Sequence, residues 1–177
     1  FIFGAYFNRE HIFNSTTLGF YNDIDVNGDG VINGADCLAG FPIACRLANS
    51  FDQIKTSTAV YPELKYTLTE HLTVRGGLRY TYDEGKLVGY QSQYQDASGN
   101  FLGSLISPSD VAAEGADRFK KSNVSGKAGL DYKTSSGQLI YISYSRGYRG
   151  NGFNAQAFFS PAEVTVAKPE TLADIEG

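Results

Sequence analysis

The stretch HLTVRGGLRYTYDE, residues 71–84, alternates apolar and polar side chains along nearly its whole length. This period of two predicts a β-strand with one apolar and one polar face. At about 3.4 Å per residue, the strand is longer than most strands of soluble proteins and suits a tilted crossing of a bilayer. One face would carry Leu72, Val74, Gly76, Leu78, Tyr80 and Tyr82, and the other Thr73, Arg75, Gly77, Arg79, Thr81 and Asp83.

The same alternation recurs on both sides of this strand. Short turns, TEH at 69–71 and SSG at 135–137, join the expected strands into hairpins. Pro62 cannot donate a ladder hydrogen bond, so a bulge or a locally broken pairing is expected there. The further strands expected are FIFGAYFN (1–8), KTSTAVYPELKYTL (55–68), KSNVSGKAGLDYKT (121–134) and QLIYISYSRGYRG (138–150).

The connections alternate between these short turns and long polar segments at 9–52, 85–119 and 150–170. Long loops are uncommon inside compact domains, whereas outer-membrane barrels combine short periplasmic turns with long extracellular loops. The sequence therefore predicts an all-β fold, an antiparallel transmembrane β-barrel fragment of about five to six strands. Residues 1–177 would form an open curved sheet, part of one larger domain, with the three long segments as extracellular loops. The alternative is a soluble antiparallel sandwich or barrel, in which the apolar faces turn inward.

The composition and the side-chain pattern argue against a nucleic-acid-binding protein and against an enzyme. The chain has 15 Lys and Arg against 19 Asp and Glu and a pI near 5.1. This acidic balance argues against a nucleic-acid partner, which normally meets a basic patch. No arrangement of side chains typical of a catalytic centre is recognisable, so an enzyme is not expected.

The first long segment contains DVNGDGVINGAD, residues 25–36, which has the spacing of an EF-hand-type calcium loop and resembles the loop of dockerin modules. Gly30 occupies the position where the sharp turn needs a positive φ. The alternative is a solvated turn in which Asp and Asn side chains cap backbone donors. The calcium ligands expected are Asp25, Asn27, Asp29, Val31 through its carbonyl, Asn33 and Asp36.

The two cysteines, Cys37 and Cys45, follow this loop in a polar, glycine-rich stretch. A local disulfide is the favoured interpretation and would require an oxidising compartment. Two free thiols or a metal pair remain as alternatives.

Three stretches resemble the barrel of TonB-dependent outer-membrane receptors, and they occur in the order found in that family. They are LTEHLTVRGGLRYTYDE (68–84), LIYISYSRGYRGNGFN (139–154) and KPETLADIEG (168–177). The resemblance implies a 22-stranded barrel filled by a plug, located in the outer membrane of a Gram-negative bacterium. It also implies import of a scarce, bulky nutrient, such as an iron–siderophore complex, cobalamin or a saccharide, driven through the TonB protein.

The partners expected are thus the TonB system, a small-molecule or metal-chelate ligand, and outer-membrane lipid or lipopolysaccharide. Arg146 and Arg149 would face polar loops or lipopolysaccharide phosphates, or contact an anionic ligand at the barrel mouth. Two competing functions remain open: a passive porin-like barrel without a plug, and a secreted, calcium-stabilised β-protein that binds glycans.

Overall fold

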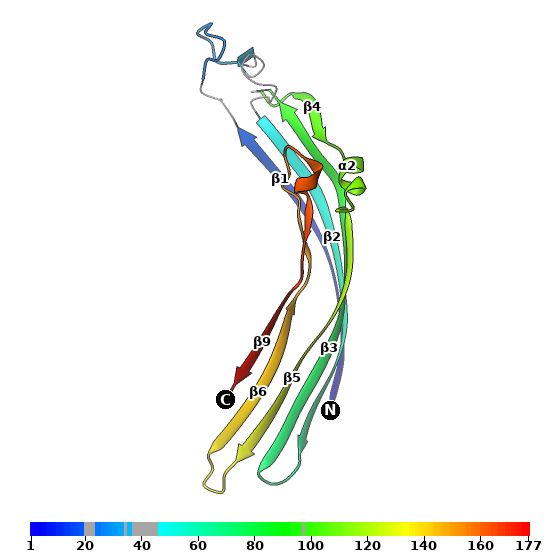
Figure 1. Ribbon diagram of the computed structural model, residues 1–177, viewed down its shortest axis with the longest axis vertical. Coiled ribbons are helices and arrows are strands. Elements are labelled where there is room, and N and C mark those ends of the chain that lie inside the picture. Colours follow the sequence, from blue (N-terminus) through cyan, green and yellow to red (C-terminus); the bar gives the residue numbers. More distant parts are fainter. Residues whose placement is uncertain (20–23, 34, 37–45, 97) are drawn as a thin grey trace.

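The computed structural model describes residues 1–19, 24–33, 35–36, 46–96 and 98–177. Its main element is one antiparallel sheet, curved and open at both edges, with strand order β1-β2-β3-β5-β6-β9 (Figure 1). The sheet strands are β1 (Ile2–Gly19), β2 (Arg46–Thr67), β3 (Leu72–Gln95), β5 (Arg118–Lys133), β6 (Leu139–Arg149) and β9 (Glu170–Glu176). The smaller elements are β4 (Phe101–Ile106), which pairs with β3, helix α2 (Pro108–Ala113), the β7 (Gly152–Asn154) and β8 (Thr165–Ala167) hairpin, and the 3-10 turn η1 (Pro161–Glu163).

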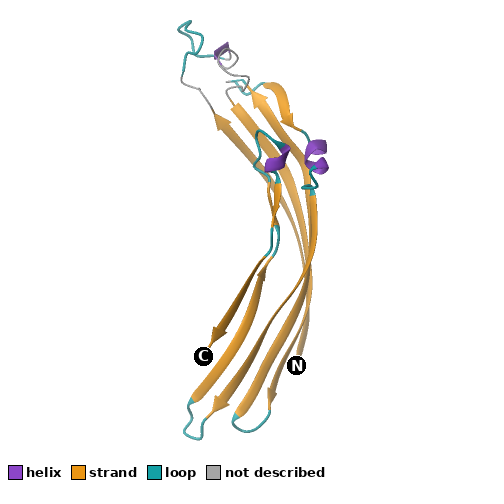
Figure 2. Cartoon of the chain, in the orientation of Figure 1, coloured by secondary structure: helices purple, strands orange, loops and turns teal. Residues whose placement is uncertain are grey.

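This single layer confirms the predicted all-β, antiparallel barrel fragment (Figure 2). A sandwich would place a second sheet against the apolar face, but the apolar side chains of β3 remain open to the surroundings. Leu78 is 61% exposed and Tyr80 is 49% exposed. In the described part of the chain, no helix is long and apolar enough to cross a bilayer.

The strands are longer than the sequence predicted, and the three long loops are correspondingly shorter. Much of 9–52 belongs to β1 and β2, and β3 runs on to Gln95 inside the segment 85–119. The segment 150–170 carries β7, η1 and β8, and β9 begins at its end. The added ends of β1, β2 and β3 lack a clean apolar period because the outer surface of the sheet meets water beyond the bilayer. Backbone pairing with the neighbouring strands still holds these ends extended.

The expected irregularity at Pro62 is present. The register of β2 with β3 passes from Val60↔Tyr80 to Glu63↔Gly77 and omits Tyr61 and Pro62. On its other side, Pro62 still faces Phe3 of β1. The ladder is therefore interrupted on one side only, as the missing proline N–H requires.

A β-bulge divides β3 into two parts. The register with β2 shifts between Ser50 and Asp52, and Gly89 adopts a φ of +65°. A glycine in the left-handed conformation is typical of such a bulge, which reverses the alternation of faces beyond it. The bulge lets Leu87 and Tyr90 both point to the polar side of the sheet, where both join one buried cluster.

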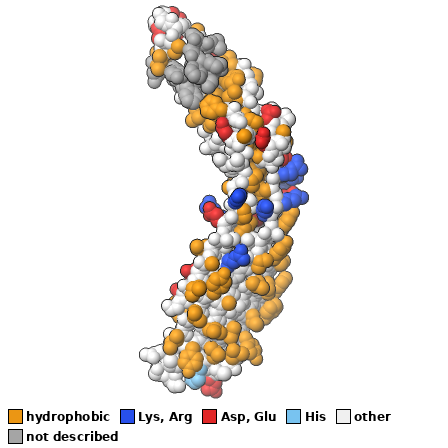
Figure 3. All heavy atoms as spheres, viewed as in Figure 1, with side chains coloured by type: hydrophobic (Ala, Val, Ile, Leu, Met, Phe, Trp, Pro, Cys, Tyr) orange, Lys and Arg blue, Asp and Glu red, His pale blue; other side chains and the backbone are white. Residues whose placement is uncertain are grey.

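The faces of the sheet differ in chemistry. The outer face holds the apolar set of β3 that includes Leu78 and Tyr80, and the inner face holds its polar set, including Arg79 and Asp83. Figure 3 shows hydrophobic side chains gathered over the half of the molecule that bears the short turns, with Lys and Arg side chains near mid-height. This apolar surface supplies a lipid-facing band, and the strands continue beyond it.

Candidate functional site

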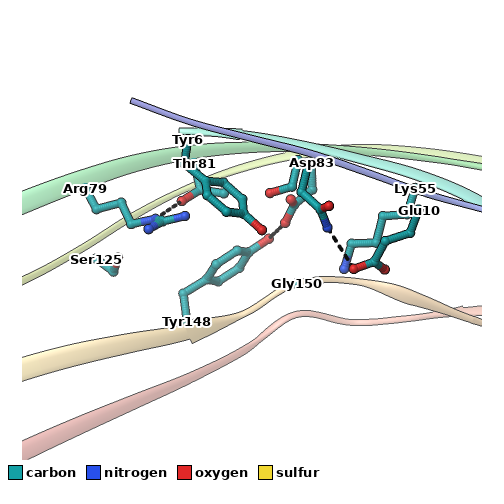
Figure 4. Close-up of a pocket in the computed structure, with 11 residues that line it drawn as sticks. Tyr6, Glu10, Lys55, Arg79, Thr81, Asp83, Ser125, Tyr148 and Gly150 are labelled. Carbon is teal, nitrogen blue, oxygen red and sulfur yellow. Dashed lines mark hydrogen bonds between the residues drawn. The ribbon is translucent and has the colours of Figure 1, made fainter. Parts of the chain in front are cut away.

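A polar hollow of about 390 Å3 lies on the inner face of the sheet. Five strands or their ends contribute to it, so the topology rather than any local motif assembles it (Figure 4). The hollow mixes carboxylates, cations, hydroxyls and an amide, which suits the binding of a polar group. Its lining residues are Tyr6, Asn8, Glu10, Lys55, Ser57, Arg79, Thr81, Asp83, Ser125, Tyr148 and Gly150.

Asp83 is the buried centre of this hollow. It is only 2% exposed, and its Oδ2 accepts a hydrogen bond of 2.9 Å from the Tyr148 hydroxyl. Tyr148 belongs to β6, whereas Asp83 belongs to β3, and β5 lies between these two strands. The bond therefore ties the end of β6 across the inner face, because the pairing of β5 with β6 begins only at Gly126↔Arg146.

Gly150 allows the chain to pass directly over this pair. A Cβ at Gly150 would lie 2.5 Å from Asp83 Oδ2 and 3.2 Å from Lys55 Nζ. Any larger residue would therefore push the carboxylate or the chain aside, which explains the glycine at this point.

Arg79 supplies the cationic side of the hollow. Its guanidinium carbon lies 5.0 Å from the centre of the Tyr6 ring and 5.8 Å from that of Tyr61, and its Nε donates to Thr81 Oγ1 at 3.2 Å. Stacking against two rings fixes the arginine while leaving its remaining N–H groups able to bind an acceptor.

The segment that follows Gly150 folds inward over the far end of the sheet. Ala157 is fully buried, and its carbonyl accepts hydrogen bonds from the Tyr90 hydroxyl at 2.7 Å and from Asn49 Nδ2 at 3.1 Å. Ser92 Oγ donates to the Phe158 carbonyl at 3.3 Å. The apolar side chains of this cluster are Phe51, Leu87, Tyr90, Ile106, Val111, Ala116, Ala155, Ala157 and Val164.

This inward segment, residues 151–164, thus narrows the space in front of the inner face. Two points hold it: the Tyr148–Asp83 bond at its base and the Tyr90–Ala157 bond near its tip. The sequence predicts an extracellular loop at 150–170, but no pattern in it marks Tyr148, Tyr90 or Ala157. Two features of the sequence could have pointed to this arrangement: Gly89, where the bulge occurs, and Gly147 and Gly150 on either side of Tyr148.

The two arginines considered for anionic contacts lie apart from the hollow. Arg149 Nη1 is 3.5 Å from Glu170 Oε2, an exposed ion pair between β6 and β9. Arg146 is the cross-strand partner of Gly126 in β5. Neither lines the polar hollow centred on Asp83.

The described part of the loop 25–36 curls its polar side chains inward. Asp25 Oδ1 accepts hydrogen bonds from the backbone N–H of Gly28 at 2.7 Å and of Asp29 at 3.2 Å, and its Oδ2 accepts from Gly30 N–H at 2.7 Å. Gly30 has a φ of +81°, as expected for the sharp turn. Asp29 Oδ1 accepts from Val31 N–H at 2.8 Å, and Asn33 Nδ2 donates to the Val31 carbonyl at 3.0 Å.

Asp36 closes the loop. It is 2% exposed; its Oδ1 accepts from Val26 N–H at 3.0 Å and from Asn27 N–H at 3.3 Å, and its Oδ2 accepts from Asn33 N–H at 2.6 Å. The Asn33 N–H bond contributes most to lowering the pKa of the Asp36 carboxyl, so the group is held as a carboxylate. Among the described residues, no group of three His, Cys, Asp or Glu side chains converges as a metal site would. Cys37 and Cys45 lie outside the described residues.

Comparisons with known proteins agree with the assignment of the sheet to a β-barrel. Residues 2–173 match the family model described as "TonB dependent receptor-like, beta-barrel". No curated protein matches the chain. Among solved structures, the ferric yersiniabactin uptake receptor FyuA from Yersinia pestis aligns with a TM-score of 0.48 and 18% sequence identity over 73% of this chain.

The chain spans 17% of the length of that receptor. The family consists of receptors in the outer membrane of Gram-negative bacteria rather than of enzymes, which agrees with the predicted location and with the expectation of no enzymatic activity. Because the family model covers nearly the whole chain, the chain belongs to the TonB-dependent receptor β-barrel family.

Proposed function

We propose that this chain is a wall segment of an outer-membrane receptor that imports a scarce, bulky nutrient with energy supplied through TonB. The observation that carries the proposal is the single sheet, apolar outside and polar inside, in a chain that matches the receptor barrel model from residue 2 to residue 173. A passive porin-like barrel and a secreted glycan-binding protein fit that family less well.

The ligand class we propose is an iron–siderophore complex, cobalamin or a saccharide. All three are large and rich in oxygen atoms, and the inner face offers donors and acceptors of both signs. Arg79 and Lys55 supply cations, and Glu10 and Asp83 supply carboxylates. Such a surface can exchange hydrogen bonds with a polar ligand or with a polar domain inside the barrel.

Uptake by the complete receptor tests this proposal. Cells that express the full gene would be supplied with radiolabelled ferric siderophores, cobalamin and oligosaccharides, in strains with and without TonB. We expect one class to accumulate only when both the receptor and TonB are present. Accumulation that continues without TonB would favour a passive pore and would refute the proposal.

We also propose that the loop 25–36 binds calcium as a structural ion. Support comes from the EF-hand-type spacing and from the positive φ of Gly30 at the sharp turn. The carboxylates of Asp25, Asp29 and Asp36 accept hydrogen bonds from backbone N–H groups of the same loop, and calcium would have to replace some of these donors. Calcium would take carboxylate, amide and carbonyl oxygens there, and Val31 would offer its main-chain oxygen. The same segment would be closed by a Cys37–Cys45 disulfide, which non-reducing mass spectrometry of the peptide can detect.

Calorimetric titration of the full receptor with calcium tests the ion. We expect one additional site with an affinity in the millimolar range or tighter, which Asp25→Asn abolishes. The matched control is Asp96→Asn, at a turn where Asp96 Oδ1 accepts from the Asn100 N–H at 2.8 Å. Equal binding by the wild type and Asp25→Asn would leave the loop as a hydrogen-bonded turn only.

A further inference from the structure

The strands β5 and β6 are paired along only part of their length (Figure 1). β5 pairs with β3 from Arg118 to Tyr132, but it pairs with β6 only from Gly126 to Lys133. In the described part of the chain, residues 118–125 therefore have a neighbouring strand on one side only. We call the line between β5 and β6 the β5–β6 seam. Its paired half lies toward the short turns, and its open half lies toward the long connections.

Part of the open edge of β5 lies at the height of the bilayer. A tilted strand needs about ten residues to cross the hydrocarbon layer, which takes β3 from Thr73 to Tyr82. The register places Asp131 and Ser122 of β5 opposite these two residues, so the open edge of residues 122–125 falls within the layer. Lipid offers no hydrogen bonds to backbone N–H and C=O groups, so pairing with a further strand would stabilise this edge.

The end of β6 is long enough to supply that pairing. Its last partner on β5 is Gly126, which faces Arg146, and β6 itself continues to Arg149. The same register, continued to the end of β6, would place Arg149 opposite Asn123. The upper end of β6 thus has a matching edge available in β5, from which it is separated in the structure.

The side chain of Tyr148 shows that the two arrangements exclude each other. Side chains alternate between the faces of a strand, so continued pairing with β5 would put Tyr148 on the outer face with Ile142 and Tyr144. These two side chains are 54% and 45% exposed on that face. In the structure the Tyr148 hydroxyl instead donates to Asp83 Oδ2 on the inner face (Figure 4).

Contacts on the inner face hold the seam open. Besides the bond from Tyr148 to Asp83, Phe119 of β5 packs against Phe153 of β7, with ring centres 5.1 Å apart. Closing the seam would draw Tyr148 away from Asp83 and would carry β9 along, because β9 is paired with β6. It would also move the base of the inward segment 151–164, which follows directly after this end of β6.

We propose that the β5–β6 seam is a switch in the barrel wall with two arrangements. In the open arrangement, Tyr148 binds Asp83 and the inward segment 151–164 stands in front of the inner face. In the closed arrangement, the end of β6 pairs with β5 up to Asn123, and the base of the segment withdraws from the inner face. A few hydrogen bonds are exchanged for a few others, so the two arrangements lie close in free energy. Closing the seam completes the wall and widens the passage in one movement, whichever nutrient is carried.

Cysteine cross-linking in the purified full-length receptor detects the closed seam. The test pair is Asn123→Cys/Arg149→Cys, because facing residues of antiparallel strands lie within disulfide reach. The matched control is Lys127→Cys/Ser145→Cys, which faces the same way and is already paired. Each pair removes one exposed ion pair, so the two variants lose comparable surface contacts. A mild oxidant forms the disulfide, and mass spectrometry of the linked peptides distinguishes it from bonds to the native cysteines.

We expect the control pair to cross-link quickly and the test pair slowly, since only the closed fraction reacts. Tyr148→Phe removes the bond to the Asp83 carboxylate and should accelerate cross-linking of the test pair roughly tenfold, with no change in the control. Absence of cross-linking in the test pair, even with Tyr148→Phe, would overturn the switch. A rate equal to that of the control and insensitive to Tyr148→Phe would overturn it as well, because the seam would then be permanently paired.

Hydrogen exchange of the cross-linked receptor checks the coupling to the inward segment. The Val164 N–H donates to the Pro161 carbonyl at 3.1 Å, and we expect it to exchange several-fold faster once the test pair is linked. The cross-linked control should exchange like the wild type. Unchanged exchange in the cross-linked test pair would show that closing the seam leaves the segment in place, against the proposal. Because neither measurement requires uptake, failure of the switch and failure of the transport proposal are separate results.

Discussion

Replacing Tyr90 with phenylalanine should release the inward segment 151–164 without unfolding the sheet. The Tyr90 hydroxyl donates to the Ala157 carbonyl at 2.7 Å and accepts from Asn49 Nδ2 at 2.9 Å, and the side chain is 2% exposed. Tyr90→Phe removes both bonds and keeps the ring in the cluster.

The expected size of the effect follows from the bond to Ala157. Asn49 and Tyr90 both belong to the sheet, so only the bond to Ala157 joins Tyr90 to the segment. A typical buried hydrogen bond contributes about 1 kcal/mol net. Asn49 Nδ2 keeps its own bond of 3.1 Å to the Ala157 carbonyl, so that acceptor stays satisfied. The loss is therefore about 1 kcal/mol, which corresponds to a roughly fivefold larger population of the open segment.

Amide hydrogen exchange of the full-length receptor measures this opening. Phe158 N–H donates to Glu163 Oε2 at 3.0 Å and Val164 N–H donates to the Pro161 carbonyl at 3.1 Å, so both amides should exchange roughly fivefold faster in Tyr90→Phe. The control is Tyr94→Phe, on the same strand, whose hydroxyl has no hydrogen-bond partner in the described part of the chain. Unchanged exchange in Tyr90→Phe, or the same acceleration in both variants, would refute the role assigned to this bond.

Two further predictions concern the polar hollow and the loop 25–36. Gly150→Ala should lower the free energy of unfolding by about 1–3 kcal/mol, because the new Cβ would lie 2.5 Å from Asp83 Oδ2. Gly152→Ala is the control, since its Cβ would meet no atom within 4 Å, and it should be nearly neutral in the same thermal unfolding assay. Asp36 has a lowered pKa in the folded loop, chiefly through the Asn33 N–H, so its contribution to stability is present above about pH 3.9 and is lost as the pH falls through the lower, folded-state value. NMR titration of the Asn33 amide should follow that loss, and a midpoint at or above 3.9 would contradict the assignment.

The strand pattern could be read from the sequence because alternation is a local property. The two faces of residues 71–84 can be assigned from this stretch alone. The interrupted ladder at Pro62 is predictable because proline has no backbone N–H to donate. The family could be recognised for the same reason, since its three characteristic stretches are continuous in the chain. In residues 9–19 most side chains on both faces are exposed, and in residues 85–95 the bulge at Gly89 breaks the alternation. The local pattern therefore fades in both stretches, and the sequence suggested loops.

The candidate site depends on tertiary structure. Asp83 and Tyr148 are 65 residues apart and meet only because β6 parts from β5 after Arg146 and bends over the inner face. Tyr90 points inward only because the bulge at Gly89 shifts the alternation by one residue, which no count along β3 predicts.

The sequence by itself thus determined the sheet, its apolar outer face and the membership of a receptor family, because each depends on side chains that are neighbours in the chain. Only the tertiary structure decided how far the strands extend, which segment folds inward, and which side chains meet in the polar hollow. Those features depend on register and strand separation, and register is settled by pairing between segments far apart in the chain.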